Sequence, residues 1–172
     1  MKKRLSISVL AAVFSQAAFC ADHIPNQKIE KFDFTKLYAG AGFNNNRIDT
    51  STIGATDGKA SGIQVFAGYE YGQRNGFDIA AEAGLIQTGE FYNGGNNDAD
   101  GIWAAAVVSK DLPEVDDKLS ALIRLGFGLG GDDGLLMGFG AQYKVQSQTF
   151  IRLEYLNKDI SQSYQVNAIY KF

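Results

Sequence analysis

Hydrophobic and polar residues alternate along most of this chain with a period of two. The last nine residues show the pattern most clearly, and five of them share one face: Tyr164, Val166, Ala168, Tyr170 and Phe172. Gln165, Asn167 and Lys171 take the other face, because successive side chains of a β-strand point to opposite sides. Ile169 is the one residue that breaks the alternation. The segment therefore predicts an amphipathic β-strand.

Seven earlier segments, most of which alternate in a similar way, are separated by clusters of turn-forming residues. They are residues 37–43, 63–71, 77–85, 102–109, 119–130, 135–145 and 151–155. Segment 102–109 is apolar on both faces, so the pattern leaves the direction of Trp103 open. Because no segment has sustained helical periodicity, the sequence predicts an all-β chain. We expect an eight-stranded antiparallel up-and-down barrel.

The connections between the predicted strands differ in length. Those after the first and third strands, residues 44–60 and 89–100, are long and polar, and those after the second, fourth and sixth are tight. Bacterial outer-membrane barrels have long extracellular loops, short periplasmic turns and an even number of strands, of which eight is the smallest. The short connections GDDG and NKDISQS after the fifth and seventh strands depart from this pattern. We expect residues 44–60 and 89–100 to lie outside the cell.

Alternation alone does not show which face of a barrel points inward. A soluble lipocalin-like carrier has the same period with its apolar face turned inside. Here the polar face is mostly Gly, Ala, Ser and Gln, whereas a surface in water carries more Lys and Glu. Its few charges are of both signs: Glu70, Glu82, Arg124, Lys144, Arg152 and Glu154. Such charges can pair in a narrow interior but cost about 2–4 kcal/mol each against lipid near the midplane, which favours a transmembrane barrel.

The amino terminus has the pattern of a secretory signal peptide. Basic residues at positions 2–4 precede an apolar run that ends at Ala21, which is too short and interrupted to span a bilayer. Cleavage after Cys20 and cleavage after Ala21 both remain open, and Phe19 fits a lipidation site at Cys20 poorly. Either cleavage leaves a mature chain without cysteine. We expect a signal peptide at 1–21, a periplasmic segment at 22–36 and the barrel at 37–172.

Charge argues against nucleic acid as a partner. The leader holds three of the 16 basic residues and none of the 19 acidic ones, so its removal changes the formal net charge from −3 to −6. Binding of nucleic acid needs a basic patch. The mean hydropathy of −0.13 is compatible with a membrane barrel, because only alternate residues of each strand meet lipid.

Residues suited to catalysis or metal binding are sparse. The single histidine, His23, precedes every predicted strand, whereas enzymatic outer-membrane barrels depend on a histidine base. No Cys/His cluster has metal-ligand spacing. The loop carboxylates are expected to be solvated rather than to bind calcium: Asp98, Asp100, Asp132, Asp133 and Asp159. The glycines of 126–131 lie inside a strand, so they relieve crowding in the lumen or bend the wall rather than hold phosphate. We expect no enzymatic activity, metal or cofactor.

Several stretches together resemble the OmpA-type eight-stranded outer-membrane barrels, including the small OmpX-like and Ail-like members. They are IQVFAGYEYG, FDIAAEAGL, LSALIRLGFGLG, FIRLEYLN and YQVNAIYKF. The resemblance implies a lumen filled by a network of paired charges, which maps to Glu82, Arg124, Arg152 and Glu154. It also implies that the last strand, ending on Phe172, is read by the barrel-assembly machinery. We do not expect the peptidoglycan-binding domain of larger relatives.

Three functions fit these observations. The first is a monomeric protein in outer-membrane lipid that stabilises the envelope or contacts a host or surface ligand through loops 44–60 and 89–100. The second is a narrow pore for small solutes, since the Gly-rich lumen face of the fifth and sixth strands leaves space for water. The third is a periplasmic lipocalin-like carrier. The first is favoured, and specificity is expected to reside in the loops.

Overall fold

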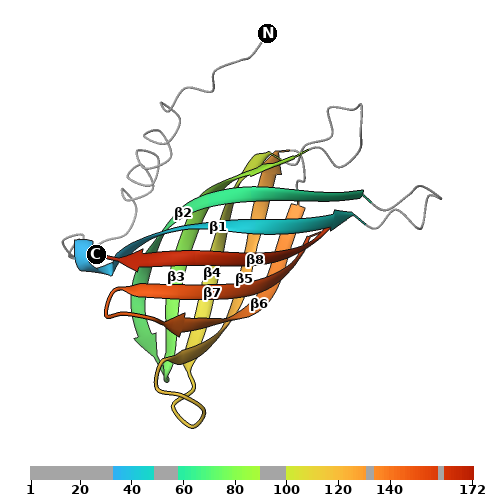
Figure 1. Ribbon diagram of the computed structural model, residues 1–172. Coiled ribbons are helices and arrows are strands. Elements are labelled where there is room, and N and C mark those ends of the chain that lie inside the picture. The colour runs from blue at the N-terminus through green and yellow to red at the C-terminus, as the bar shows by residue number, and fades with distance from the viewer. Residues whose placement is uncertain (1–32, 49–57, 90–99, 131–133, 159–160) are drawn as a thin grey trace, which may run out of the picture. The chain divides into compact units, whose positions relative to one another are not determined.

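The computed structural model describes residues 33–48, 58–89, 100–130, 134–158 and 161–172. Its strands are β1 (Leu37–Ile48), β2 (Gly58–Arg74), β3 (Phe77–Thr88), β4 (Gly101–Asp111), β5 (Leu119–Gly130), β6 (Gly134–Lys144), β7 (Thr149–Lys158) and β8 (Ser161–Lys171). Each pairs antiparallel with its neighbour in sequence, and β8 pairs with β1 to close the ring (Figure 1). The predicted eight-stranded antiparallel barrel is therefore confirmed.

The up-and-down order gives the barrel two different ends. Connections after odd-numbered strands lie at one end, which we call the loop end, and connections after even-numbered strands lie at the other, the turn end. The predicted signal peptide and most of both long loops fall outside the described residues. Of the predicted periplasmic segment 22–36, the structure describes Asp33 and the 3-10 helix η3 (Phe34–Lys36). The Asp33 carboxylate accepts hydrogen bonds from the Thr35 amide and hydroxyl, which lower the pKa of Asp33.

The strands are longer than the hydrophobic pattern predicts. β1 continues from Phe43 to Ile48 through three asparagines and Arg47, so part of the predicted loop 44–60 is strand. β2 likewise runs to Arg74, which leaves Asn75 and Gly76 as a two-residue hairpin turn. Both have positive φ, 53° and 79°, as the type I′ turn requires. Hydropathy marks only the part of a strand that faces lipid, whereas the hydrogen-bonded ladder continues beyond it.

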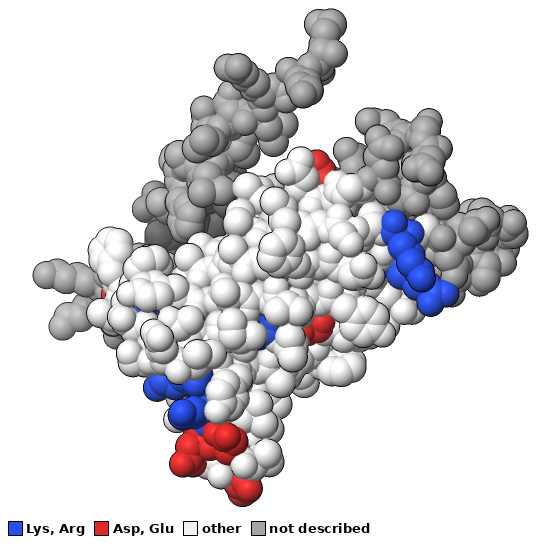
Figure 2. Space-filling view, in the orientation of Figure 1, with Lys and Arg blue, Asp and Glu red and all other residues white. Residues whose placement is uncertain are grey.

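The two faces of the wall separate as the alternation predicts. On β5, outward-facing Leu125 and Leu129 are 48% and 53% exposed, whereas inward-facing Arg124 is 1% exposed. On the face of the barrel that Figure 2 shows, the surface between the two ends is mostly white and therefore carries few charges. β4, which the sequence left unassigned, points Trp103 inward and the neighbouring Ile102 outward. This orientation is opposite to that of a lipocalin-like carrier, whose apolar face is internal.

The lumen contains more apolar side chains than the sequence analysis expected. Ile169, the apparent misfit of the last strand, points inward and is 2% exposed. It belongs to an inner apolar cluster with Tyr38, Phe66, Ala80, Ile86, Trp103, Ala105, Val107, Leu122 and Leu136. The interior of an eight-stranded barrel is only wide enough for side chains to fill, so inward positions accept apolar residues once solvent is excluded.

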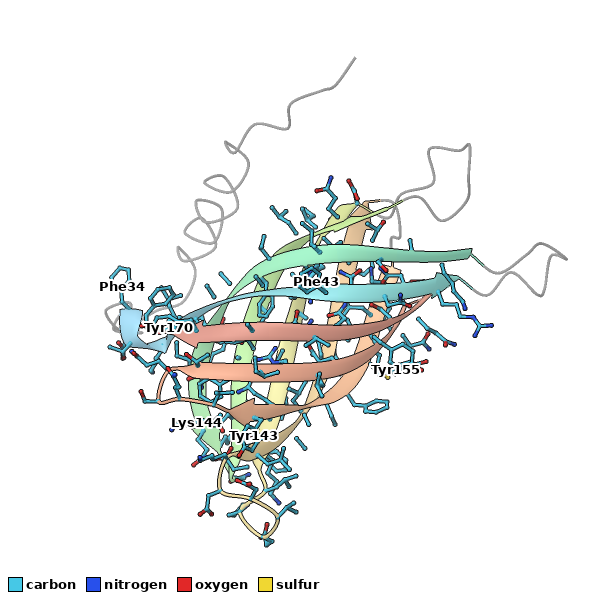
Figure 3. The ribbon with its side chains drawn as sticks, viewed as in Figure 1. Phe34, Phe43, Tyr143, Lys144, Tyr155 and Tyr170 are labelled. Atoms are coloured by element: carbon cyan, nitrogen blue, oxygen red, sulfur yellow. The ribbon has the colours of Figure 1, made fainter. Side chains whose placement is uncertain are left out.

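Aromatic side chains mark both ends of the outer wall. Phe34, Tyr143 and Tyr170 lie toward the turn end and Tyr155 toward the loop end (Figure 3). Such girdles flank the lipid-facing band of outer-membrane barrels, where aromatic rings lie at the level of the headgroups. Among the described residues, no helix is both long enough and apolar enough to cross a membrane.

Candidate functional site: a charged cluster inside the barrel

Strands β3, β5 and β7 bring the four predicted lumen charges together. Arg124 Nη2 lies 2.6 Å from Glu82 Oε2 and 3.1 Å from Glu154 Oε2. Arg152 Nη1 lies 2.6 Å from Glu82 Oε1. All four residues point inward because they occupy the same parity on their strands, and each is at most 4% exposed. Two positive and two negative charges thus form one buried cluster, which we call the charge cluster.

Neutral polar side chains add hydrogen bonds to the charge cluster. The Tyr38 hydroxyl donates to Glu82 Oε1 at 2.7 Å, and Asn167 Nδ2 donates to Glu154 Oε2 at 3.1 Å. Arg152 Nε donates to Gln142 Oε1 at 3.0 Å. Glu82 therefore accepts from both arginines and a tyrosine, which compensates for its removal from water.

Two aromatic rings cover the arginines. The Arg124 guanidinium lies 4.7 Å from the centroid of the Trp103 ring, and both Arg124 and Arg152 lie 5.8 Å from that of Phe66. The two rings contact each other with centroids 5.7 Å apart. A cation over an aromatic face is stabilised by the ring quadrupole, and the interaction strengthens where water is excluded.

Glycines in the wall make room for these large inner side chains. A Cβ at Gly40 would collide with the Phe66 ring, and one at Gly68 would collide with the Tyr38 ring. On β6, a Cβ at Gly138 would meet the Leu156 side chain. The space next to these three glycines is thus occupied by side chains of neighbouring strands. At these three positions the glycines relieve crowding in the lumen.

On the loop side of the charge cluster the lumen is filled by amides and apolar side chains. Gln64 Nε2 donates to Gln165 Oε1 at 2.7 Å and to Asn167 Oδ1 at 2.6 Å. A cavity of about 10 Å³ lies between Gln64, Gln165, Trp103 and Arg124. That volume holds at most about one water molecule.

The residues of the predicted assembly signal lie on the outer face of β8. Tyr164, Val166, Tyr170 and Phe172 are between 47% and 63% exposed, and Ala168 has the same parity. The Phe172 amide donates to the Leu37 carbonyl at 3.1 Å, which continues the closing ladder with β1 to the last residue.

The remaining candidates from the sequence do not form a second site. Lys144 is exposed at the turn end, and Glu70 forms a half-exposed ion pair with Lys171, so neither joins the charge cluster. His23 and all loop aspartates except Asp100 fall outside the described residues. Asp100 Oδ1 accepts from the Thr88 amide at 2.8 Å. The described part of the chain contains no group of three or more His, Cys, Asp or Glu suited to a metal ion.

Comparison with known proteins identifies the architecture. The family model for the outer membrane protein beta-barrel domain matches residues 6–172. The chain belongs to this family.

Three solved structures show the same fold. Neisserial surface protein A is 17% identical to this chain and has a TM-score of 0.55. The match covers 80% of this chain and 97% of Neisserial surface protein A. Ail, the attachment invasion locus protein of Yersinia pestis, is 15% identical with a TM-score of 0.52, covering 79% and 97%. A de novo designed transmembrane barrel is also similar, at 16% identity and a TM-score of 0.55, covering 80% and 96%. No curated protein matches the sequence.

Sequence reasoning found the charges of the cluster but missed their surroundings. The pattern of hydrophobic and polar residues does not indicate that the Tyr38 hydroxyl contacts Glu82. Phe66 lies at an inward position, where polar residues were expected. Trp103 lies in the ambiguous fourth strand. The available signal is indirect: Gly40, Gly68 and Gly84 sit at inward positions, and each marks a place where a neighbouring strand supplies a large ring.

Proposed function

We propose that this protein is a monomeric, non-enzymatic outer-membrane barrel whose lumen is closed and whose function resides on its loop-end surface. The charge cluster carries this proposal. Glu82, Arg124, Arg152 and Glu154 balance in sign and are paired with one another. A selectivity filter is instead lined by charges of one sign that face a water-filled path. The interior thus supports the wall rather than passage of a solute.

The paired strands of the barrel support a role at the cell surface, because they can hold the loops in place. The described strands are long and fully paired, so they form a scaffold that can present loops. Binding residues are commonly carried on loops positioned by a rigid scaffold. We infer that segments 44–60 and 89–100 contact a surface ligand or stabilise the envelope. The narrow pore remains the second candidate, and conductance distinguishes the two.

Labelling of intact cells tests this orientation. Single cysteines replace Ser51, Asn96 and Asp116, in a chain whose own Cys20 is expected to leave with the signal peptide. An impermeant thiol reagent should label positions 51 and 96 on intact cells and position 116 only after the outer membrane is opened. Labelling of position 116 alone on intact cells would invert the model.

Loop deletions then test the functional assignment. Removing residues 49–57 or 90–99 should leave the heat-modifiable barrel intact, because both segments lie between completed strands. The deletions should reduce cell-surface binding or envelope integrity, measured by adhesion and detergent-sensitivity assays. A control deletion of 114–117 in a turn-end connection should leave both unchanged. Full adhesion and detergent resistance in both loop-deletion strains would refute the surface role.

A further inference from the structure

Two side-chain N–H groups at the charge cluster have no hydrogen-bond partner among the described residues. They are Nε1–H of Trp103 and Nε–H of Arg124, and the two residues are 6% and 1% exposed. Arg124 uses its Nη2 for Glu82 and Glu154, so Nε–H is a separate donor. Buried N–H groups without a partner are rare, because each one has given up its hydrogen bonds to water. Both donors therefore call for an acceptor inside the barrel.

The cavity of about 10 Å³ on the loop side of the charge cluster, which we call the inner cavity, is lined by both residues. The guanidinium carbon of Arg124 lies 4.7 Å from the centroid of the Trp103 ring, so the two side chains are in contact beside it. About 10–15 Å³ is the smallest volume that holds one water molecule. A larger acceptor, such as a phosphate or a carboxylate group, does not fit.

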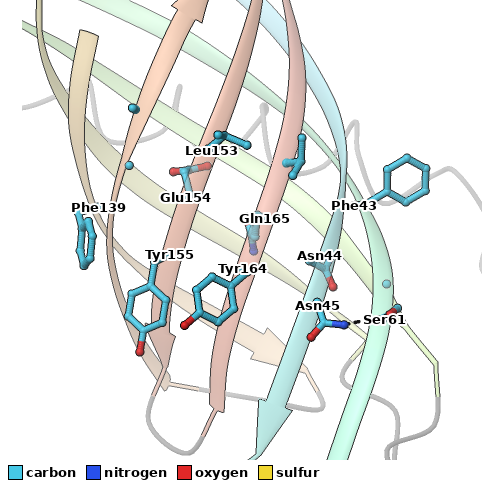
Figure 4. Close-up of a pocket in the computed structure, with 14 residues that line it drawn as sticks. Phe43, Asn44, Asn45, Ser61, Phe139, Leu153, Glu154, Tyr155, Tyr164 and Gln165 are labelled. Carbon is cyan, nitrogen blue, oxygen red and sulfur yellow. Dashed lines mark hydrogen bonds between the residues drawn. The ribbon is translucent and has the colours of Figure 1, made fainter. Parts of the chain in front are cut away.

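Two carboxamide side chains, Gln64 and Gln165, also line the inner cavity. Gln165 points into the lumen, whereas its neighbour Tyr164 points outward (Figure 4). The Gln165 Oε1 atom accepts a hydrogen bond from Gln64 Nε2 at 2.7 Å. Because a carboxamide oxygen has two lone pairs, Gln165 can accept a second hydrogen bond. The inner cavity thus has hydrogen-bond acceptors as well as donors along its wall.

The orientation of these amides follows from the charge cluster. Glu154 is ionised in its pair with Arg124 and can only accept, so the Asn167 amide nitrogen faces it, at 3.1 Å. The Asn167 oxygen then faces Gln64, whose Nε2 donates to it at 2.6 Å and also donates to Gln165. Both N–H groups of Gln64 are therefore used in these bonds, and its oxygen lies at the other end of the amide. That oxygen can act only as an acceptor.

We propose that the inner cavity binds one water molecule, which links the charge cluster to the amides on its loop side. The water oxygen accepts hydrogen bonds from Trp103 Nε1–H and Arg124 Nε–H. Its two O–H groups donate to the carboxamide oxygens of Gln64 and Gln165. These four bonds use both lone pairs and both protons of one water molecule. The site lies apart from the loop-end surface and does not depend on the orientation of the barrel in the membrane.

The bound water is enclosed by buried side chains. The remaining residues that line the inner cavity are at most 8% exposed: Ile86, Leu136, Leu156 and Lys158. A water molecule in a polar site of this size is an ordered part of the structure, whereas an apolar cavity stays dry. We therefore expect it to exchange slowly with bulk solvent. A water-filled path through the lumen would instead exchange its water quickly.

Water–protein cross-peaks in NMR spectra of the purified, folded full barrel in detergent micelles test the site. Trp103 is the only tryptophan of the chain, so its indole N–H gives a single signal. Wild type should show a cross-peak between this proton and water, and its sign in rotating-frame spectra should indicate dipolar contact rather than chemical exchange. A missing cross-peak, or one with the sign of chemical exchange, would overturn the proposal.

Two variants locate the water that gives this signal. Leu136→Phe fills the inner cavity while both N–H donors and both glutamines remain, so the cross-peak should be lost. Gln64→Leu removes one acceptor and should weaken the cross-peak several-fold. The matched control is Gln142→Leu. Gln142 also bonds an arginine of the lumen, Arg152, but it is not among the described residues that line the inner cavity. This variant should keep the wild-type cross-peak.

Folding of each variant is verified by heat-modifiable gel mobility. A wild-type cross-peak in folded Leu136→Phe or in Gln64→Leu would overturn the assignment, because the signal would then come from water or a hydroxyl group outside the inner cavity. If Leu136→Phe does not fold, the comparison of Gln64→Leu with Gln142→Leu decides. These measurements do not involve the loops, so their failure is distinguishable from a failure of the loop-deletion and labelling experiments.

Discussion

The inner and outer faces of the barrel wall are built from the same strands but are stabilised in different ways. Inside, Glu82 and Arg152 are almost fully buried and held at 2.6 Å by an ion pair. Outside, side chains such as Phe43 and Leu153 are more than half exposed and have few strong contacts within the protein. The inner face is ordered by ion pairs and hydrogen bonds between specific side chains, whereas the outer face is stabilised by the lipid that surrounds it. Substitutions should therefore have different consequences on the two faces.

The largest effect is expected from breaking the charge cluster. Glu82→Ala removes the acceptor of Arg124, Arg152 and Tyr38, and it leaves both guanidinium groups buried without that partner. Loss of one member of a buried ion pair costs about 3–5 kcal/mol. Urea unfolding of the reconstituted barrel, followed by gel mobility, measures the change in free energy of unfolding.

The matched control for this prediction is Glu70→Ala. Glu70 also forms an ion pair, with Lys171, but their side chains are 34% and 31% exposed. Water screens such a pair, so its loss should cost less than about 1 kcal/mol. Equal destabilisation by the two variants would contradict the distinction between the buried cluster and the barrel mouth.

A slightly smaller effect is expected from placing charge on the outer face. Leu125→Arg introduces a cation at an outward position near the middle of β5, which should cost about 2–4 kcal/mol in a bilayer. Leu129→Arg, on the same face near the loop end, should cost at most about 1 kcal/mol. The two leucines are similarly exposed, so the comparison isolates depth. Equal costs in lipid vesicles would show that this wall does not face the hydrocarbon.

The smallest effect on the finished barrel is expected at the closing strand, where the change acts on assembly. Tyr170→Ser/Phe172→Ser removes an outward pair of rings with centroids 5.5 Å apart. Outer-membrane fractions should then contain several-fold less heat-modifiable, protease-resistant protein. Tyr71→Ser/Phe77→Ser removes two exposed turn-end rings without touching β8 and serves as control. Wild-type levels in the first variant would exclude this segment as the assembly signal.

How much the sequence predicts also differs between the two faces. The outer face was predictable because lipid imposes one rule on the outward residues of the lipid-facing band, so alternation alone placed residues such as Ile63, Val65 and Leu125 correctly. The inner face follows no single rule. Ile169 and Leu122 are as buried as Arg124 is, because a filled lumen accepts any side chain whose neighbours complete its packing.

The site itself was partly predictable for the same reason. A charge inside an amphipathic strand is costly against lipid, so Glu82 and Arg124 had to point inward. Their contacts with Tyr38 and Trp103 depend on which strands lie opposite one another across the lumen. That arrangement follows from closure and register of the whole barrel, which local alternation does not specify.

Planar-bilayer recording of the purified wild-type protein tests the central claim most directly. Because Phe66, Trp103 and the charge cluster project into the lumen, the account predicts a stable baseline without sustained single-channel openings. Insertion is verified in parallel by protease resistance of the same preparation. Sustained, unitary conductance from inserted wild-type barrel would contradict the closed lumen and support the pore.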